Sequence, residues 1–598
     1  MAHKVTFTPR RYLPKLGRLG NFDISPDGTR LAYAANRGEQ WTVYVRALSG
    51  KKNRVLLQSE QAVLNPEFSP DGRTIAVQSD FEGDENFNIY LVPTMGGSAV
   101  KLTDTPADSS VPRWSPDGKA IAFRSNRDGD RDNVFVVDAA GGMPGQLTHT
   151  ADIVGDFAWR PNGREIAFSA GIGHEDWVGL VDLDGNMVKL VAQADSESSL
   201  GAEEGRTRPF SPDGRELAFV SNVHDHMDIG VIDLETRAVR WPVRNRWDKS
   251  MPLWSPNGAR LAFLENRDGN VRLWTVGARG GRAQPVSPVD GVATRPVWHP
   301  DSRALLYTHT TSVEPVRLVL QSGAQRRILV ESARTKLPRG ELARARLVRY
   351  PSFDGRMIPA WLYEPPKARS RGAAIVDPHG GPESQELDEW DSGHQFLVAQ
   401  GFTVLAPNYR GGTGYGRAWR TVSDHDLGGA DMEDILAGAR WLLRTKRVRP
   451  GRLGIFGISY GGYAVAHCLE KAPDLWTVGV SVVGYFNWFT ATTNERGYLQ
   501  VYDHHKMGTP EADAERFRTY SPIFYLDRIR APVLFTGGAH DPRCPVTEAR
   551  TMVEDMRAAG KTVDYLEFPD EGHWPRKTSN QIRLYERTLE WLNRYLPW

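Results

Sequence analysis

Three residues in the last quarter of the chain have side chains that together could transfer an acyl group: Ser459, Asp541 and His573. Each follows a short apolar run that is typical of a buried strand, at 453–456, 533–536 and 565–568. A serine hydroxyl attacks a carbonyl only when a base takes its proton and a third group orients that base. The residue types and their order along the chain fit this requirement.

The serine lies in Gly457-Ile458-Ser459-Tyr460-Gly461, between the expected strand and an expected helix. Strand, Gly-x-Ser-x-Gly and helix form the nucleophile elbow of an α/β-hydrolase. The turn is sharp, so a Cβ at either glycine would collide with a neighbouring element. The same turn directs the Tyr460 N–H to where an oxyanion would form. The plainer interpretation of the pattern alone is a Gly-rich turn.

The acid and the base each have a plainer interpretation too. Asp541 could cap a turn, and His573 could be a surface histidine. His540 competes as the base, but it precedes the acid and shares its loop. Because α/β-hydrolases carry their triad in the order Ser, Asp, His, the sequence favours Ser459, Asp541 and His573 as the catalytic residues.

A second oxyanion donor is expected from His379-Gly380-Gly381, which follows an apolar strand at 373–376. Glycines in a His-Gly-Gly loop let backbone N–H groups approach a developing negative charge. The alternative is an ordinary turn. The Gly-rich stretch 408–416 is not a phosphate loop, because no Gly-Lys-Ser/Thr ends it.

The first half of the chain is repetitive. An aromatic residue or Ile, then Ser-Pro-Asp-Gly or a degenerate form of it, then an apolar pair recurs seven times, with the prolines at 26, 70, 116, 161, 212, 256 and 300. Repeats of about 45 residues built from strands and turns predict a β-propeller, here with seven four-stranded blades. In the Pro-Asp-Gly turns Pro fixes φ, Asp caps the turn and Gly takes positive φ, so these motifs are scaffold.

From residue 347 the pattern changes to apolar strands that alternate with helices, after a hairpin around Asp354-Gly355. Such alternation predicts a doubly wound α/β sheet. The basic, unpatterned stretch 331–346 separates the two patterns. We therefore expect a seven-bladed β-propeller over residues 1–335, with a short N-terminal extension, and an α/β-hydrolase domain over residues 336–598.

Composition excludes several classes of function. Lys and Arg number 74 and Asp and Glu 73, so the net charge is +1, which argues against nucleic-acid or membrane-surface partners. The two cysteines, Cys468 and Cys544, cannot form a disulfide framework and suit a reducing compartment. No apolar run is long enough to span a membrane and no signal peptide is expected. We expect a cytoplasmic protein with no cofactor and no metal.

The motifs together resemble the prolyl oligopeptidase family of serine peptidases, and most closely its acylaminoacyl-peptidase branch. The resemblance rests on the repeats and on His-Gly-Gly-Pro, Asn-Tyr-Arg-Gly-Gly-Thr-Gly-Tyr-Gly, Gly-Ile-Ser-Tyr-Gly-Gly, Asp-Pro-Arg-Cys-Pro-Val and Asp-Glu-Gly-His. It implies the same triad. It also implies an oxyanion hole built from the backbone of Gly380, Gly381 and Tyr460, with the Tyr415 hydroxyl as a further candidate.

The resemblance also offers weaker candidates for substrate binding. Arg496 could hold a substrate carbonyl, although a surface arginine is the simpler interpretation. Glu203 and Glu204, in the longest repeat, could bind a free amino terminus as in the dipeptidyl-peptidase branch, although a solvated loop is favoured. An apolar pocket could be walled by aromatic residues that are as often core: Tyr463, Phe486 and Trp488.

The sequence thus predicts a serine peptidase that cuts short peptides, with the propeller limiting access as the resemblance implies. A dipeptidyl- or carboxy-terminal exopeptidase, an esterase or amidase on small non-peptide substrates, and an inactive propeller scaffold are the alternatives. The complete triad disfavours the last. The peptide terminus that is recognised and the formation of a homo-oligomer are left open.

Overall fold

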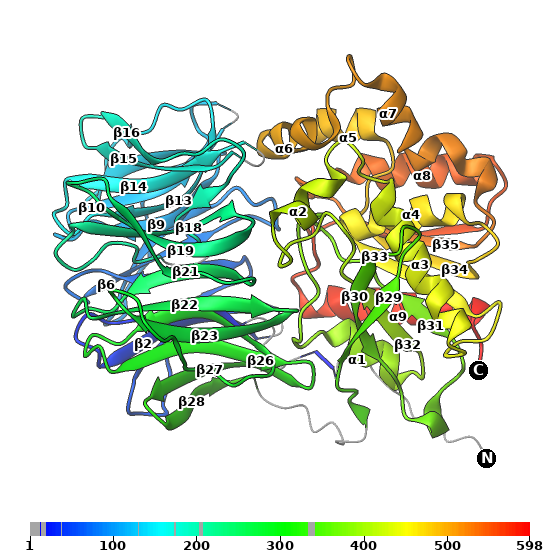
Figure 1. Ribbon diagram of the computed structural model, residues 1–598, viewed down its shortest axis with the longest axis horizontal. Coiled ribbons are helices and arrows are strands. Elements are labelled where there is room, and N and C mark those ends of the chain that lie inside the picture. The colour runs from blue at the N-terminus through cyan, green and yellow to red at the C-terminus, as the bar shows by residue number, and fades with distance from the viewer. Residues whose placement is uncertain are drawn as a thin grey trace.

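The computed structural model describes residues 12–13, 19–37, 39–129, 131–172, 175–202, 207–332 and 341–598. Figure 1 shows two lobes side by side, an all-β lobe from the first half of the chain and a mixed lobe from the second. The expected boundary between residues 335 and 336 lies outside the described residues, as do Glu203 and Glu204.

The all-β lobe contains five four-stranded antiparallel sheets in the described residues. Their strands are β1 (Leu19–Ile24), β2 (Arg30–Arg37), β3 (Gln40–Ala47), β4 (Arg54–Ser59); β5 (Val63–Phe68), β6 (Thr74–Ser79), β7 (Asn88–Pro93), β8 (Val100–Lys101); β9 (Ser109–Trp114), β10 (Ala120–Ser125), β11 (Asn133–Asp138), β12 (Gly145–Gln146); β13 (Ile153–Trp159), β14 (Glu165–Gly171), β15 (Trp177–Asp182), β16 (Met187–Val191); and β17 (Ser198–Ser199), β18 (Glu216–His224), β19 (His226–Asp233), β20 (Val239–Val243).

An eight-stranded sheet completes this lobe. It comprises β21 (Asp248–Trp254), β22 (Arg260–Arg267), β23 (Asn270–Gly277), β24 (Gln284–Pro285), β25 (Val292–Trp298), β26 (Ala304–Thr311), β27 (Glu314–Ser322) and β28 (Gln325–Glu331). Two antiparallel groups of four strands are joined in it only by the parallel pairing of Val271 with Val292. The first and last strands of the lobe also pack together, because Phe22 and Leu31 share a buried cluster with Leu318 and Val330.

The Ser-Pro-Asp-Gly turns have the expected chemistry. The Ser25 hydroxyl donates to Asp27 Oδ1 at 2.5 Å, the Thr29 N–H donates to the same oxygen at 2.9 Å, and Gly28 has φ +72°. The bond from Ser to Asp recurs at Ser69, Ser115 and Ser211. The repeated motif therefore stabilises the turn between the first two strands of a sheet.

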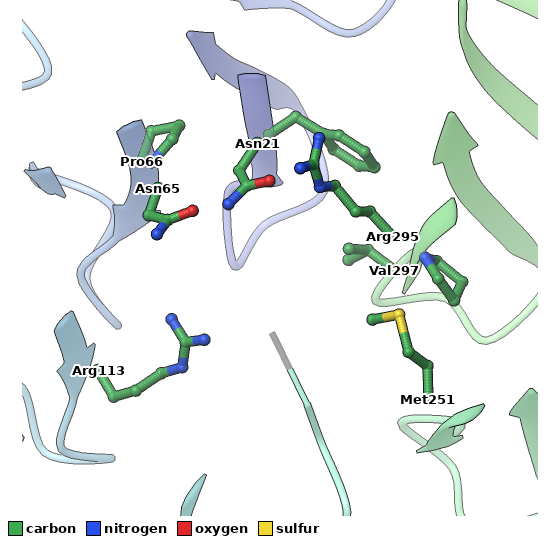
Figure 2. Close-up of a pocket in the computed structure, with 9 residues that line it drawn as sticks. Asn21, Asn65, Pro66, Arg113, Met251, Arg295 and Val297 are labelled. Atoms are coloured by element: carbon green, nitrogen blue, oxygen red, sulfur yellow. The ribbon is translucent and has the colours of Figure 1, made fainter. Parts of the chain in front are cut away.

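Innermost strands of several sheets meet around a narrow space (Figure 2). Arg113 and Arg295 extend into it together with Asn21, Asn65 and Met251. The space has a volume of about 20 Å³, which is room for about one water molecule. A second cavity of about 350 Å³ adjoins it between Arg113 and Arg208.

The mixed lobe is built on a second eight-stranded sheet in the order β29-β30-β32-β31-β33-β34-β35-β36, with antiparallel pairing only among β29, β30 and β32. The strands are β29 (Arg346–Pro351), β30 (Met357–Tyr363), β31 (Ala374–Val376), β32 (Thr403–Pro407), β33 (Leu453–Ile458), β34 (Val478–Val482), β35 (Val533–Gly538) and β36 (Val563–Phe568). The expected hairpin joins β29 to β30, with Gly355 at φ +83°.

Helices cover both faces of this sheet. One core cluster involves α3 (Ala430–Arg444), α4 (Tyr460–Lys471) and α8 (Val546–Ala558), and the other involves α1 (Ser392–Ala399) and α9 (Thr578–Tyr595). The remaining helices are α2 (Arg417–Arg420), α5 (Trp488–Asn494), α6 (Gly497–Met507), α7 (Ala514–Thr519) and the 3₁₀ turns η3 (Lys367–Arg369), η4 (Thr421–Ser423) and η5 (Pro522–Arg528). The parallel strands β31–β36 thus direct their carboxyl ends to one edge, where the candidate catalytic residues follow.

Candidate active site

Ser459 occupies the sharp turn between β33 and α4. Its backbone has φ +60° and ψ −123°, a conformation that a residue other than glycine rarely adopts. A Cβ on Gly457 would collide with the Gly461 carbonyl, and a Cβ on Gly461 would collide with the Pro378 carbonyl oxygen. The glycines of the motif are thus required sterically, and strain is concentrated at the serine, as is common at functional residues.

Asp541 and His573 are joined directly by hydrogen bonds. His573 Nδ1 lies 2.9 Å from Asp541 Oδ2 and 3.0 Å from Oδ1. Asp541 Oδ1 also accepts from the backbone N–H groups of Arg543 (2.9 Å) and Cys544 (3.0 Å). The carboxylate is therefore held by its own loop and directed at Nδ1, which leaves Nε2 as the ring nitrogen able to accept a proton.

The nucleophile lies beside the loop that carries the acid. Burial raises the pKa of the Cys544 thiol well above its ordinary value, and the nearby Ser459 side chain lowers it by a smaller amount. Cys544 is buried and remains protonated as a result. Because Cys544 N bonds to Asp541, the structure brings Ser459, Asp541 and His573 to the same edge of the sheet. The sequence pattern gave no signal for the Cys544 contact.

The His-Gly-Gly loop runs alongside the nucleophile. A Cβ on Gly380 would lie 3.2 Å from Ser459 Cβ and 3.0 Å from the Ile458 carbonyl oxygen, so the backbone of the loop approaches the nucleophile closely. The ring of His379 stacks on Tyr409 with centroids 4.1 Å apart, and the Tyr409 hydroxyl donates to the His379 carbonyl at 2.8 Å. Burial lowers the pKa of His379 to about 4, so this histidine is neutral and structural.

Tyr415 is held by contacts with neighbouring residues of its own segment. Its hydroxyl accepts from Asn408 Nδ2 at 3.0 Å, and its ring packs against Trp419. Burial raises the pKa of Tyr415 to about 12, which keeps the hydroxyl protonated and able to donate. Its contribution to an oxyanion hole stays a prediction.

The three aromatic candidates for a substrate pocket belong to the core. Tyr463, Phe486 and Trp488 are at most 1% exposed. The Tyr463 ring stacks on Tyr485 at 5.1 Å and contacts Trp488 edge-on. Their role as pocket walls stays a prediction, and Tyr485 is a neighbour that sequence patterns did not single out.

The Arg496 side chain forms hydrogen bonds with residues of the all-β lobe. Its guanidinium donates to the carbonyl oxygens of Asp84 (2.7 Å) and Glu85 (3.1 Å) and to Asn86 Oδ1 (2.7 Å). These partners lie about 410 positions earlier in the chain, so no local pattern could identify them. A contact between Arg496 and a substrate carbonyl remains untested.

The fold and this site define a class of protein, an α/β-hydrolase with an attached β-propeller. A model of the prolyl oligopeptidase family matches residues 389–597, and a model of the TolB β-propeller domain matches residues 22–206 and 202–341. Residues 389–597 therefore match the prolyl oligopeptidase family, and the first half of the chain matches a β-propeller domain.

Two relatives are named as dipeptidyl peptidases. Dipeptidyl aminopeptidase BIII of Pseudoxanthomonas mexicana is 30% identical over 40% of this chain, and dipeptidyl-peptidase 5 of Porphyromonas gingivalis is 25% identical over 65%. These alignments span only 37% and 58% of the two relatives, less than two thirds of either.

Solved structures share the whole fold at lower identity. A puromycin-hydrolyzing peptidase of Mycobacterium tuberculosis superimposes with a TM-score of 0.87 at 19% identity, over 99% of this chain and 96% of that one. An acylaminoacyl peptidase of Pyrococcus horikoshii gives 0.76 at 19% identity, over 99% and 98%. In the described part of the chain, no helix is both long and apolar enough to cross a membrane.

Proposed function

We propose that this protein is a serine peptidase that hydrolyses short peptides through Ser459, His573 and Asp541. The observation that carries the proposal is the strained Ser459 turn beside an Asp541–His573 pair bonded at 2.9 Å. In the proposed triad the Ser459 hydroxyl donates its proton to His573 Nε2. Asp541 fixes the ring and stabilises the imidazolium that forms.

The reaction proceeds in two acyl transfers. Ser459 Oγ attacks the substrate carbonyl carbon while His573 Nε2 takes the hydroxyl proton. The C–N bond of the tetrahedral intermediate then breaks, and His573 gives its proton to the leaving amine. Water attacks the acyl-enzyme with the same base, which releases the acid product and restores Ser459.

The oxyanion of each intermediate needs donors on the opposite side of the carbonyl. We assign the N–H of Tyr460, at the first residue of α4, and the backbone of Gly380 and Gly381. The close approach of Gly380 to Ser459 supports this assignment. The Tyr415 hydroxyl, which accepts from Asn408 and keeps its own proton to donate, is a further candidate.

The propeller is proposed to have seven blades, with the domain boundary at residues 335/336, and to restrict access to the site. Seven groups of four strands, β1–β4 through β25–β28, support the count. Arg46 of the first group donates to the Leu329 carbonyl of the last group at 2.9 Å. Arg327 of the last group donates to the Leu48 carbonyl, just after β3, at 3.0 Å. These two bonds support closure of the ring. The Arg113 and Arg295 side chains, which extend into the space between the innermost strands, support a barrier to large substrates.

The terminus of the substrate is the open part of the proposal. An acylaminoacyl-peptidase type is our first choice, and a dipeptidyl-peptidase is a second candidate that the names of the two relatives favour. A carboxy-terminal exopeptidase and an esterase or amidase remain alternatives. Cytoplasmic location and a homo-oligomer also stay predictions.

A labelling and turnover experiment tests the function. A fluorophosphonate should label Ser459 in the wild-type protein and leave Ser459→Ala unlabelled, with unchanged thermal unfolding. Acetylated, free-amine and amidated chromogenic peptides then identify the terminus that is recognised. Labelling of Ser459→Ala at the wild-type level would show that another residue is the nucleophile.

A further inference from the structure

A loop of the propeller lies directly on the catalytic loops. The propeller loop, residues 80–86, connects β6 to β7 and contacts both the acid loop (539–544) and the histidine loop (569–577). We propose that the propeller loop positions His573 and Asp541 for catalysis, so that the propeller is part of the active-site scaffold as well as a barrier. The inference rests on the proposed function.

The closest approach is between two backbones, one residue before the catalytic histidine. A Cβ on Gly83 would lie 2.7 Å from Gly572 N, and a Cβ on Gly572 would overlap the Gly83 carbonyl. On its other side Gly572 packs against Gly538 of β35. A Cβ added to Gly538 would overlap the Gly572 carbonyl oxygen. The histidine loop is thus held between the central sheet and the propeller.

Ion pairs from the same loop flank the catalytic acid. Glu82 Oε2 lies 3.0 Å from His540 Nε2, and Glu85 Oε2 lies 3.0 Å from Arg543 Nε. His540 and Arg543 stand on either side of Asp541, and Arg543 N donates to its carboxylate. The position of the acid is therefore linked to the propeller through its immediate neighbours.

The histidine loop has an ion pair of its own to the propeller. Arg576 Nη1 bonds to Asp80 Oδ2 at 2.6 Å, and the Asp80 side chain is fully buried. The Arg576 N–H donates to Glu571 Oε2 at 2.8 Å, which ties the two ends of the histidine loop together. These bonds restrain the segment on both sides of His573.

Arg496 fastens the propeller loop from the hydrolase side. Besides its three bonds to residues 84–86, its backbone N–H donates to the Pro542 carbonyl at 3.1 Å. One residue therefore bonds both to the propeller loop and to the residue after Asp541.

The propeller loop is also strained. Glu82 and Glu85 have φ of +48° and +57°, in the left-handed region that glycine normally occupies. A strained backbone conformation is stable only when the surrounding contacts hold it in place, and such conformations are common at functional sites. Burial raises the pKa of Glu85, but Arg543, His573 and Arg576 together bring it below its ordinary value, so the carboxylate beside Arg543 is charged.

A matched pair of glycine variants tests the proposal. Gly83→Ala forces a Cβ against the histidine loop, whereas Gly96→Ala, after β7 in the same sheet, has the same kind of positive φ (+94°) but no atom within 4 Å. The readouts are kcat and KM for p-nitrophenyl acetate, which is small enough to pass any size barrier, and the rate of fluorophosphonate labelling.

We expect Gly83→Ala to lower kcat and the labelling rate about 10- to 100-fold relative to Gly96→Ala, because small misplacements of reacting groups have effects of that size. KM should change by less than about twofold, since the small ester makes few binding contacts. Equal turnover of the two variants, or faster turnover by Gly83→Ala, would overturn the proposal and leave the propeller as a barrier only.

Glu85→Gln provides a second test if Gly83→Ala does not fold. It removes the charge beside His573 and Arg543, and we expect a several-fold loss of kcat. The control is Asp268→Asn, which breaks another contact between the lobes, the 2.6 Å pair with Arg349, away from the catalytic loops. No loss of kcat relative to that control would overturn the proposal. If the wild-type protein itself failed to label at Ser459, the proposed function would be at fault instead.

Discussion

Both carboxylate oxygens of Asp541 lie within 3.0 Å of His573 Nδ1, and Oδ1 accepts two backbone N–H groups as well. The carboxylate therefore has one orientation, fixed before any substrate binds. This geometry makes the tautomer of His573 depend on the carboxylate of Asp541.

Asp541→Asn should lower kcat about 10³- to 10⁴-fold, because an amide that donates to Nδ1 leaves the proton on Nε2, where the base must be free. Peptide hydrolysis and thermal unfolding should be measured together. Asp474→Asn, at an exposed pair with Arg530, is the matched control and should be fully active. Activity of Asp541→Asn within tenfold of that control would contradict the triad.

Gly461→Ala should destabilise the fold and reduce activity. The new Cβ would meet the Pro378 carbonyl, just before the oxyanion loop, and overpacking of this kind costs about 1–3 kcal/mol. Chemical denaturation and kcat are the measurements. Gly145→Ala, which places a methyl group in open space, should change neither. A stable, active Gly461→Ala would mean that the turn relaxes more easily than its contacts suggest.

Substrate size should strongly affect turnover. Because Arg113 and Arg295 extend into the space between the innermost propeller strands and the lobes are in close contact, we expect cleavage of peptides of up to a few tens of residues, with little cleavage of casein. Rates on a tetrapeptide and on denatured casein, compared per active site labelled, test this. Equal rates would point to an open site and to an endopeptidase of unfolded chains.

Acid should destabilise the propeller through its repeated turns. The Ser25 hydroxyl, with the Thr29 N–H and hydroxyl, lowers the pKa of Asp27 to about 2, and Ser69, Ser115 and Ser211 lower the pKa of the matching aspartates. The pKa of each of these aspartates is lower in the folded protein than in the unfolded chain, where it is about 3.9. The aspartates therefore stabilise the folded state above about pH 3.9, and this stabilisation is lost as the pH falls towards 2.

Asparagine variants measure this contribution. Two repeats already carry Asn at the position, and Asn162 and Asn257 accept the same backbone bonds. Replacing Asp27, Asp71, Asp117 and Asp213 by Asn should therefore preserve the fold and reduce the fall in unfolding temperature between about pH 4 and pH 2. An unchanged acid profile would place the acid-sensitive groups elsewhere in the chain.

The sequence by itself determined the elements and the order of the chemistry. The elbow around Ser459, the strands before Asp541 and His573, and the Ser-Pro-Asp-Gly turns depend on steric and hydrogen-bonding rules that act within a few residues. Such rules can be applied to a sequence directly. The repeat period likewise indicates a propeller, because the period is visible in the sequence without any contact between repeats.

Only the tertiary structure decided how the two lobes share the site. The sequence offered Arg496 as a candidate for binding a substrate carbonyl. In the structure its guanidinium donates hydrogen bonds to Asp84, Glu85 and Asn86. Gly83 has no motif around it, and its importance comes from the backbone of Gly572 some 490 positions later. Contacts of this kind depend on how two independently patterned halves pack, and that packing leaves no periodic or local trace in either half.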